Sequence, residues 1–350
     1  MWILFEKVKE KHSIVEIAKL LNVAPGTVSR WNTQQKVPES YRFDLMKLAG
    51  EEIDYAQFSP KDKDQLFTPN NVAQHCMEVV TQTMEELGIN IEDYIFVEPS
   101  AGSGRFLPFM PTENYIAMDV EPMADNIIKE DFLDWQPDAT KKYIVVGNPP
   151  FGLRGQKALQ FINKGFEFAD FVCFILPPLF NSDGKGSPKK RIDANLIVSE
   201  DIASFAYTYP NGESVNINTI FQIWSKLDVG INLNETYAPV GYKIYSLSDG
   251  GTPSSTRNKD KLYCCDYYLP STVFGAEKMK LYDDFESLPQ RRGYGIIVED
   301  KSLNTLIENI DWSKEAFYST NNAINLRTSL IAKAIELKKY NMLVPGLAIN

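Results

Sequence analysis

Residues 94–104 read YIFVEPSAGSG, so a short apolar segment runs directly into a glycine-rich turn. Similar apolar segments follow at 115–118, 143–146 and 171–176, with turn or helix signals between them. Short strands that alternate with helical segments are typical of a parallel α/β sheet. We therefore predict a mostly parallel sheet whose first strand ends at this turn, where glycines let the backbone approach a ligand closely.

The segment before the predicted sheet has helical character. Ser13 and Glu16 have the spacing of a capping box, and apolar residues follow at helical intervals. Pro25 suits the first position of a further helix, because its missing N–H is not needed there. We expect helices within residues 7–47, a polar linker at 50–66, and another helix at 72–87 that Gly88 ends.

The end of the predicted sheet and the C-terminal region follow a different pattern. Ser204–Tyr209 and Val215–Trp224 flank the turn Pro210-Asn211-Gly212 and predict an antiparallel hairpin. Beyond Lys226 the chain is rich in tyrosine and turn residues, and a last helix is expected at Asn325–Tyr340. We expect an α+β region there.

The charge is unevenly distributed along the 350 residues. The net charge is -10, which taken alone disfavours a nucleic-acid partner. Residues 67–150 hold 14 Asp and Glu against 4 Lys and Arg, whereas residues 7–47 hold 8 Lys and Arg against 4 Asp and Glu. We therefore expect a bipolar molecule, in which the total charge does not by itself exclude a nucleic-acid partner; binding to such a partner on one side would depend strongly on salt.

The cysteines and histidines indicate the compartment and exclude some chemistry. The 4 cysteines form no CxxC pair, and the 2 histidines are His12 and His75. We therefore expect no metal site, no histidine base and a reducing, cytoplasmic location. No apolar run approaches membrane-spanning length, so no membrane association is expected.

Polar residues follow successive predicted strands. Asp119 ends the second strand, where a carboxylate can accept the two hydroxyls of a ribose. Asp131-Phe132 places an acceptor beside an aromatic ring, a combination that suits an adenine. Each of these residues is also compatible with an ordinary loop or helix cap.

The sharpest signal is Asn148-Pro149-Pro150-Phe151 directly after the predicted strand at 143–146. Two prolines hold the chain extended where the strand ends. The Asn148 amide oxygen and the Pro149 carbonyl can then accept both hydrogens of an exocyclic amino group, and Phe151 can stack on its base. The alternative is a proline-terminated turn with a buried ring.

With Thr68-Pro69 in front, this series of motifs resembles the DNA adenine-N6 methyltransferases of restriction–modification type, in their gamma class. The resemblance covers roughly residues 65–226. It implies a Rossmann-like methyltransferase sheet and S-adenosyl-L-methionine as cofactor. The expected domains are a DNA-binding domain at 1–60, a catalytic domain at 61–226 and a target-recognition region at 227–350.

The resemblance also implies roles for single residues. The cofactor would contact Thr68, Pro69, Glu98, Pro99, Ser100, Ala101, Gly102, Gly104, Asp119, Asp131, Phe132 and Asn148. The flipped adenine would meet Asn148, Pro149, Pro150, Phe151 and a second aromatic residue. Tyr209 is the candidate for that second ring, and Phe221 is the weaker one because its strand has a core pattern.

The N-terminal helices resemble a helix-turn-helix, which implies contact with double-stranded DNA. Thr27, Ser29 and Arg30 would face the major groove, and Val28 and Trp31 would face inward. Packing or dimerisation is the alternative role for this helix pair. We interpret the basic segment with Lys185, Lys189, Lys190 and Arg191 as a mobile arm that meets phosphates, with a solvated surface loop as the alternative. Arg257, Lys259, Arg291 and Arg292 are candidate contacts in the C-terminal region, with ordinary surface charges as the alternative.

We therefore expect a site-specific DNA methyltransferase that transfers a methyl group to N6 of an adenine flipped out of the duplex. Cytosine N4, RNA adenine and protein glutamine remain alternative substrates, because the lone pairs of their amino nitrogens are also delocalised and the nitrogens are therefore poor nucleophiles. A non-catalytic DNA-binding regulator is the further alternative. A cognate restriction endonuclease is a possible partner, and the sequence leaves open whether the chain is a monomer or a dimer.

Overall fold

The computed structural model describes residues 1–343, apart from 64, 183–186, 235–236, 254 and 320–321. Internal contacts divide the chain into two compact units. The first comprises Met1–Ile175 and Ala206–Asn216, and the second comprises Leu176–Phe205 and Ile217–Asn350. The domain boundaries expected after residues 60 and 226 remain predictions.

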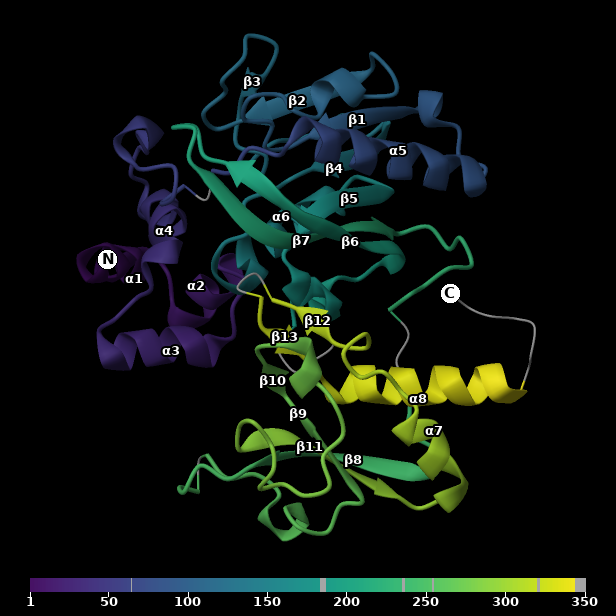
Figure 1. Cartoon of the computed structure of the whole chain (residues 1–350). Helices are drawn as coiled ribbons and strands as arrows, with labels where there is room; N and C mark the ends of the chain where they lie inside the picture. The colour runs from purple at the N-terminus through teal and green to yellow at the C-terminus, as the bar shows by residue number, and fades with distance from the viewer. Residues whose placement is uncertain (64, 183–186, 235–236, 254, 320–321, 344–350) are drawn as a thin grey trace. The chain divides into compact units, whose positions relative to one another are not determined.

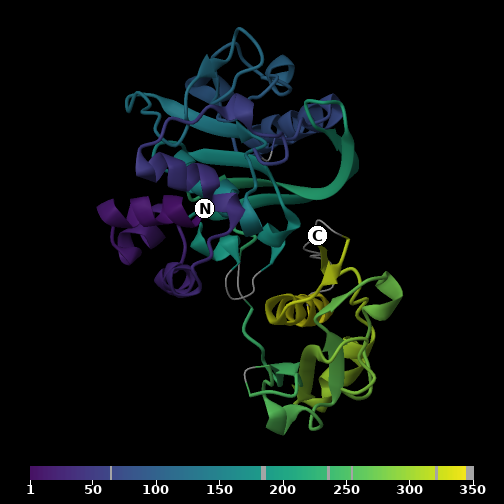
Figure 2. The same ribbon diagram turned by 90° about the vertical axis from the view of Figure 1, so that its left-hand side faces the viewer.

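Four helices at the N-terminus pack around a small core of their own, drawn in purple in Figure 2. The capping box is confirmed: the Glu16 N–H donates to Ser13 Oγ over 3.2 Å, and the Ser13 N–H donates to the Glu16 carboxylate over 2.7 Å. Pro25 begins its helix as predicted. The four helices are α1 (Trp2–Lys11), α2 (Ile14–Leu20), α3 (Pro25–Gln34) and α4 (Arg42–Ala49).

The central sheet has the strand order β3-β2-β1-β4-β5-β7-β6 (Figure 1). Its first five strands pair in parallel. β5 is buried along its whole length, as expected for an apolar strand that is covered on both faces. The predicted α/β class is confirmed. The strands are β1 (Tyr94–Glu98), β2 (Tyr115–Asp119), β3 (Ile128–Lys129), β4 (Lys142–Gly147) and β5 (Phe171–Leu176).

The helices expected between the strands are fewer than predicted. α5 (Asn70–Glu86) precedes β1, and α6 (Gln156–Gly165) connects β4 to β5. Between β1 and β4 the described residues form no α-helix, only the 3-10 turn η4 (Leu107–Phe109) and the strands β2 and β3. Prolines recur throughout this stretch and disfavour helix interiors. The glycine-rich turn therefore leads into a loop and not into a helix.

The predicted hairpin is present, and its first strand is longer than expected. β6 (Asn195–Thr208) begins nine residues before Ser204, and β7 (Ser214–Ser225) follows it. At the turn, the Tyr209 N–H donates to the Glu213 carbonyl over 2.8 Å. Neighbouring strands joined by so short a connection run antiparallel.

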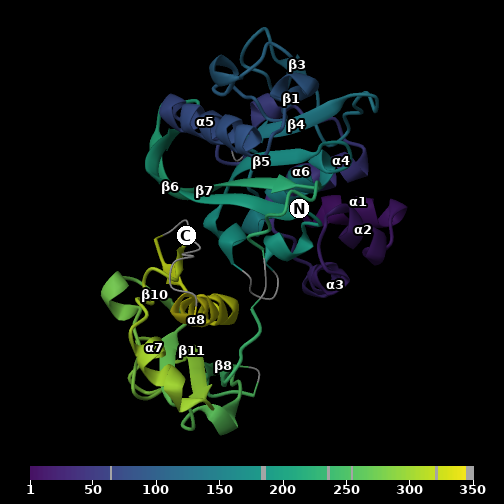
Figure 3. The same cartoon turned by 90° about the vertical axis from the view of Figure 1, so that its right-hand side faces the viewer.

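The C-terminal region has the expected α+β character. β8 (Tyr242–Ser248), β11 (Arg292–Val298) and β9 (Tyr267–Pro270) form an antiparallel sheet, and α8 lies beside it in Figures 1 and 3. The last helix begins later than predicted, because Asn325 pairs in a second small sheet. The remaining elements are β10 (Thr272–Val273), α7 (Asn304–Glu308), β12 (Phe317–Tyr318), β13 (Ile324–Asn325) and α8 (Thr328–Leu343).

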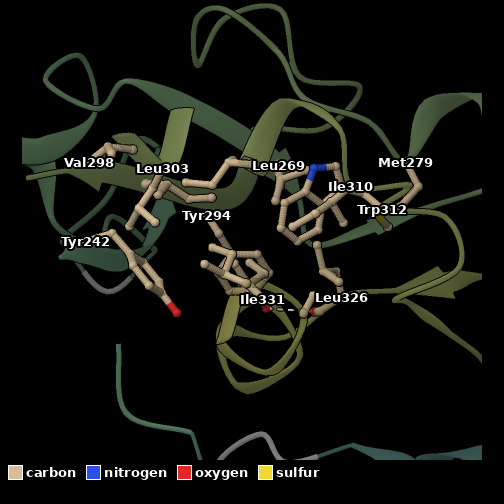
Figure 4. Packing of buried hydrophobic residues seen from close by; sticks show 14 of the residues in the cluster. Tyr242, Leu269, Met279, Tyr294, Val298, Leu303, Ile310, Trp312, Leu326 and Ile331 are labelled. Atoms are coloured by element: carbon tan, nitrogen blue, oxygen red, sulfur yellow. Dashed lines mark hydrogen bonds between the residues drawn. The ribbon is translucent and has the colours of Figure 1, made fainter. Parts of the chain in front are cut away.

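A single apolar core joins this sheet to α7 and α8 (Figure 4). Its largest side chain is Trp312, which is 2% exposed. The Tyr294 hydroxyl donates to the Leu326 carbonyl over 3.0 Å, so the one polar tip of this buried ring is satisfied. None of the helices in the described part of the chain has the length and apolar character needed to cross a membrane.

Candidate active site

A cavity opens at the carboxyl ends of β1, β2 and β4, within the first unit. This is where parallel α/β sheets bind their ligands. Most of the residues predicted from the sequence line it. They are Thr68, Glu98, Pro99, Ser100, Ala101, Gly102, Asp119, Asp131, Phe132, Asn148 and Pro150.

Asn148 lies directly after β4 with its side-chain amide held in one orientation. Its Nδ2 donates to Thr68 Oγ1 over 3.1 Å, and Ser100 Oγ donates to its backbone carbonyl over 3.2 Å. Its Oδ1 is buried and has no hydrogen-bond partner among the described residues. A buried acceptor without a partner costs free energy. Asn148 therefore presents an acceptor oxygen for which the described residues supply no donor.

The residues after Asn148 form a tight connection to α6. Pro149 is buried, and the Phe151 carbonyl accepts hydrogen bonds from the N–H groups of Lys157 and Ala158, over 3.1 and 3.3 Å. Gly152 has φ +65°, and a Cβ at this position would come within 2.8 Å of the Lys157 Cβ. The turn that carries the Asn-Pro-Pro-Phe motif therefore needs a glycine here.

Glu98 ends β1 and is almost completely buried, with 2% exposure. Its Oε2 has no hydrogen-bond partner among the described residues. Burial raises the pKa of Glu98 well above its ordinary value, and the nearby charge of Asp119 adds to the rise. A buried carboxyl group in this state is suited to a cationic partner, which would restore its charge.

Asp119 ends β2 and is oriented by two backbone groups. The N–H groups of Gly102 and Glu121 donate to its two carboxylate oxygens, each over 2.8 Å. Burial raises the pKa of Asp119, against the lowering effect of these two hydrogen bonds. Each oxygen retains a lone pair for a further donor. The neighbouring Glu121 forms an ion pair with Lys63 over 2.5 Å.

Asp131 and Phe132 line the same cavity from the loop before β4. Lys47 of α4 donates to Asp131 Oδ2 over 2.8 Å, and the Leu133 N–H donates to Oδ1 over 2.9 Å. Burial by itself would raise the pKa of Asp131, but the hydrogen bonds from Lys47 and the Leu133 N–H, together with the charges of Lys47 and Lys157, outweigh it and the pKa is lowered. The Phe132 ring packs on Phe161 of α6 with 5.4 Å between centroids.

The cavity carries an excess of negative charge. Six carboxyl residues line it, against three basic residues: Asp44, Asp62, Glu98, Asp119, Glu121 and Asp131, against Lys63, Arg105 and Lys157. Four of these acidic residues belong to the stretch 67–150. Such a lining favours a cationic ligand and disfavours a phosphate. No α-helix N-terminus follows the described β1 turn, so the usual anion site of dinucleotide folds is missing as well.

One wall of the cavity was not predicted from the sequence. It consists of Ser40, Phe43, Asp44 and Tyr55, from the N-terminal helices and the 3-10 turn η2 (Tyr55–Gln57). Lys63, in the expected linker, and Phe67, directly after it, line the cavity too. Tyr55 lies within the polar linker expected at residues 50–66, and an aromatic residue in so polar a stretch was the signal that could have indicated this wall.

Several predicted residues lie outside the cavity lining. Pro69 precedes the first residue of α5, and Gly104 shapes the turn after β1. Pro149, Phe151 and Tyr209 also lie outside it. Tyr209 still follows Thr208, which pairs with Phe67 through two hydrogen bonds of 2.7 and 3.3 Å. Since Phe67 precedes Thr68, the hairpin turn is tied to the segment that holds Asn148.

The surface residues predicted to contact DNA are only partly available. On α3, Ser29 and Arg30 are exposed, Thr27 is partly exposed, and Val28 and Trp31 are buried as expected. The described part of the basic segment forms the 3-10 turn η7 (Pro188–Arg191) and not an open arm. Lys189 is only 6% exposed. The structure therefore does not support it as a phosphate contact. Lys190 and Arg191 are exposed, and Lys185 lies outside the described residues.

Comparisons with known proteins give distant structural similarities only. Neither a family model nor a curated protein sequence matches the chain. Among solved structures, it is similar to a Pyrococcus horikoshii protein proposed to be an RNA methyltransferase, with 18% identity over 47% of this chain and 87% of that one, and a TM-score of 0.36. A Listeria monocytogenes protein proposed to be a class I S-adenosylmethionine-dependent methyltransferase has 12% identity over 66% and 90%, and a TM-score of 0.33. An S-adenosylmethionine-dependent methyltransferase from Aquifex aeolicus has 14% identity over 50% and 100%, and a TM-score of 0.29.

The strand order defines the class of fold. A sheet in the order β3-β2-β1-β4-β5-β7-β6, with parallel strands at its centre and a hairpin at one edge, is a Rossmann-like α/β arrangement. The predicted fold class is therefore confirmed as to architecture.

Proposed function

We propose that this protein is a methyltransferase that transfers a methyl group from S-adenosyl-L-methionine to N6 of an adenine in duplex DNA. The observation that carries this proposal is the state of Asn148. Its amide nitrogen is tethered to Thr68 while its buried oxygen lacks a partner among the described residues. This arrangement suits the recognition of an amino group.

The cavity supports a cationic nucleoside cofactor. Glu98 would accept from the ammonium group of the methionine part, which resolves its buried, unpaired oxygen. Asp119 would accept from the ribose hydroxyls. Asp131 would accept from the adenine amino group, with Phe132 against the base. When bound, S-adenosyl-L-methionine supplies an electrophilic methyl group on a sulfonium.

The protein's part in the reaction is to position the target nitrogen. In adenine the N6 lone pair is delocalised into the ring, so the nitrogen is a weak nucleophile. Asn148 Oδ1 and the Pro149 carbonyl would accept its two hydrogens and favour a localised lone pair. The nitrogen gains the methyl group and loses one proton, and Asn148 Oδ1 holds that hydrogen until its release to solvent. The reaction depends on orientation more than on an acid or base.

Duplex DNA is proposed as the substrate because of two further features. The exposed polar face of α3, with Ser29 and Arg30, has the form of a helix that reads a major groove. The target base must leave the duplex to reach Asn148, and Phe151 and Tyr209 are the rings proposed to stack on it. Lys190 and Arg191 would contact phosphates. A cognate restriction endonuclease remains an untested partner.

The decisive experiment combines labelled S-adenosyl-L-methionine with duplex DNA and locates the methylated base by sequencing. We expect N6-methyladenine at a fixed sequence. Asn148→Ala should abolish transfer but leave cofactor binding within a few-fold, whereas the control Asn309→Ala, at an exposed helix end, should change neither. Label on RNA, on cytosine or on protein glutamine, with none on DNA adenine, would overturn the choice of substrate. Absence of cofactor binding would overturn the proposal as a whole.

A further inference from the structure

α4 is shared between two environments. Leu45 is fully buried in the core of the N-terminal helices, where Tyr41, just before α4, packs on Trp31 of α3 with 4.7 Å between ring centroids. Phe43 and Asp44, which directly precede Leu45 in α4, line the cavity. One short helix therefore connects the core behind α3 to the ligand cavity.

The cavity side of this segment is aromatic. The Phe43 ring lies 5.3 Å from Tyr55 and 4.9 Å from Phe58, and both Phe43 and Tyr55 are half-buried. The Tyr55 hydroxyl lies among carboxylates: burial first, and then the charge of Asp131, raises the pKa of Tyr55 to about 12. An aromatic surface beside hydrogen-bond acceptors suits a nucleobase with an exocyclic amino group.

Ion pairs connect the same segment to the loop before β4 and to α6. Lys47 lies 2.8 Å from Asp131 and 2.6 Å from Asp134. Lys157 of α6 lies 2.6 Å from Asp44. The side chains of the Lys47–Asp131 pair are 40% and 28% exposed, and partly solvated pairs of this kind hold two surfaces together only weakly. The attachment of the helices to the cavity is therefore open to reinforcement by a ligand.

We propose that the N-terminal helices form the base-binding wall of the cavity, so that occupancy by an adenine nucleoside and attachment of these helices are coupled. The adenine lies between the Phe43 and Tyr55 rings on one side and Asp131 on the other. Lys47 is a positioning residue, which keeps Asp131 charged and oriented while the remaining lone pairs of the carboxylate accept from the base. The identification of the ligand as an adenine nucleoside rests on the proposed function.

Coupling of this kind acts in both directions. If the bound ligand strengthens the contact of α4 with the cavity, then disruption of the α4 wall must weaken binding of the ligand by the same factor. Through Tyr41 and Leu45, the occupied cavity also stabilises the core that supports α3. The surface of α3 proposed to bind DNA is in this way linked to the presence of the cofactor.

The test uses the full-length protein and S-adenosyl-L-homocysteine as the probe. Calorimetry should show that Phe43→Ala binds the probe at least about 10-fold more weakly than the wild type. A loss of this size is the range found when an aromatic platform for a base is removed. Phe43→Leu should recover part of the loss, and the control Phe274→Ala, at an exposed ring of the second unit, should bind like the wild type. Lys47→Met should weaken binding severalfold.

Amide hydrogen exchange separates the proposed coupling from a merely structural role of Phe43, because only coupling makes exchange in α4 and η2 respond to the probe. In the wild type, the probe should slow exchange in α4 and η2 as well as at the ends of β1 and β2. In Phe43→Ala, saturating probe should slow exchange only at the sheet. Wild-type affinity in Phe43→Ala, or no change in α4 and η2 when the probe binds, overturns the coupling and leaves the proposed function standing. Failure of the wild type to bind the probe overturns both, whereas binding with the helix response but without methyl transfer overturns the proposed function alone.

Discussion

Replacement of Glu98 by glutamine should stabilise the free protein and lower its affinity for the cofactor. In the folded chain burial raises the pKa of this carboxyl well above its ordinary value, whereas in the unfolded chain it titrates near 4.5. Between these two values the folded chain holds more protons, so the free energy of unfolding decreases as the pH rises. Glutamine has nearly the same shape and does not titrate, so Glu98→Gln removes this loss.

The magnitude follows from the burial of a charge without a partner. A difference of one pKa unit between the unfolded and folded chain corresponds to about 1.4 kcal/mol, which sets the scale of the gain at neutral or higher pH. The cofactor should lose a charge-assisted hydrogen bond, worth roughly 1.5–3 kcal/mol, so its affinity should fall at least about 10-fold.

The assay is thermal and urea unfolding of the free protein at pH 5 and pH 8, with calorimetric binding of S-adenosyl-L-homocysteine. Glu98→Gln should unfold at a higher temperature than the wild type at pH 8, and the difference should shrink at pH 5. Glu85→Gln, at an exposed position on α5, is the matched control and should show neither effect. An unchanged pH dependence in Glu98→Gln would refute the assignment of the raised pKa, and unchanged affinity would refute its role toward a cationic ligand.

Three further outcomes are expected. Thr68→Val should lower methyl transfer about 10-fold, because the Asn148 amide loses the acceptor that orients it, while Thr68→Ser should stay near wild type. Gly152→Ala should destabilise the protein by about 1–3 kcal/mol and abolish transfer, since its backbone has φ +65°, whereas Gly26→Ala within α3 should be neutral or stabilising, as urea unfolding would show. Tyr294→Phe should destabilise the C-terminal core by about 1 kcal/mol in the same assay.

The elements of the sheet were predictable because their signals are local. Strand residues at Tyr94, Tyr115, Tyr143 and Phe171 begin or lie next to the observed strand starts, and apolar runs of this length are needed wherever a parallel strand is buried on both faces. Of the helical segments expected between the strands, no α-helix forms among the described residues between β1 and β4, where prolines disfavour one. The early start of β6 was missed, since residues before Ser204 carry no alternating pattern strong enough to distinguish strand from loop.

The site was only partly predictable for a different reason. Glu98, Asp119 and Asn148 follow strands, and parallel strands end at one edge of the sheet, so their convergence could be inferred from the order of motifs. The wall at Phe43 and Tyr55 could not, because these residues lie in a segment that reads as a separate helical domain and a polar linker.

By itself, the amino-acid sequence determined the α/β class, the positions of its parallel strands and the residues at their carboxyl ends, because strand patterns and proline-terminated turns depend on neighbours along the chain. Only the tertiary structure decided which oxygens lack a partner, that Lys189 is buried, and that α4 lines the cavity. Burial and desolvation depend on segments brought together from distant positions, as Lys47 and Asp131 are. The acidic stretch at 67–150 shows the division: composition revealed its charge, and folding placed four of its carboxylates around one cavity.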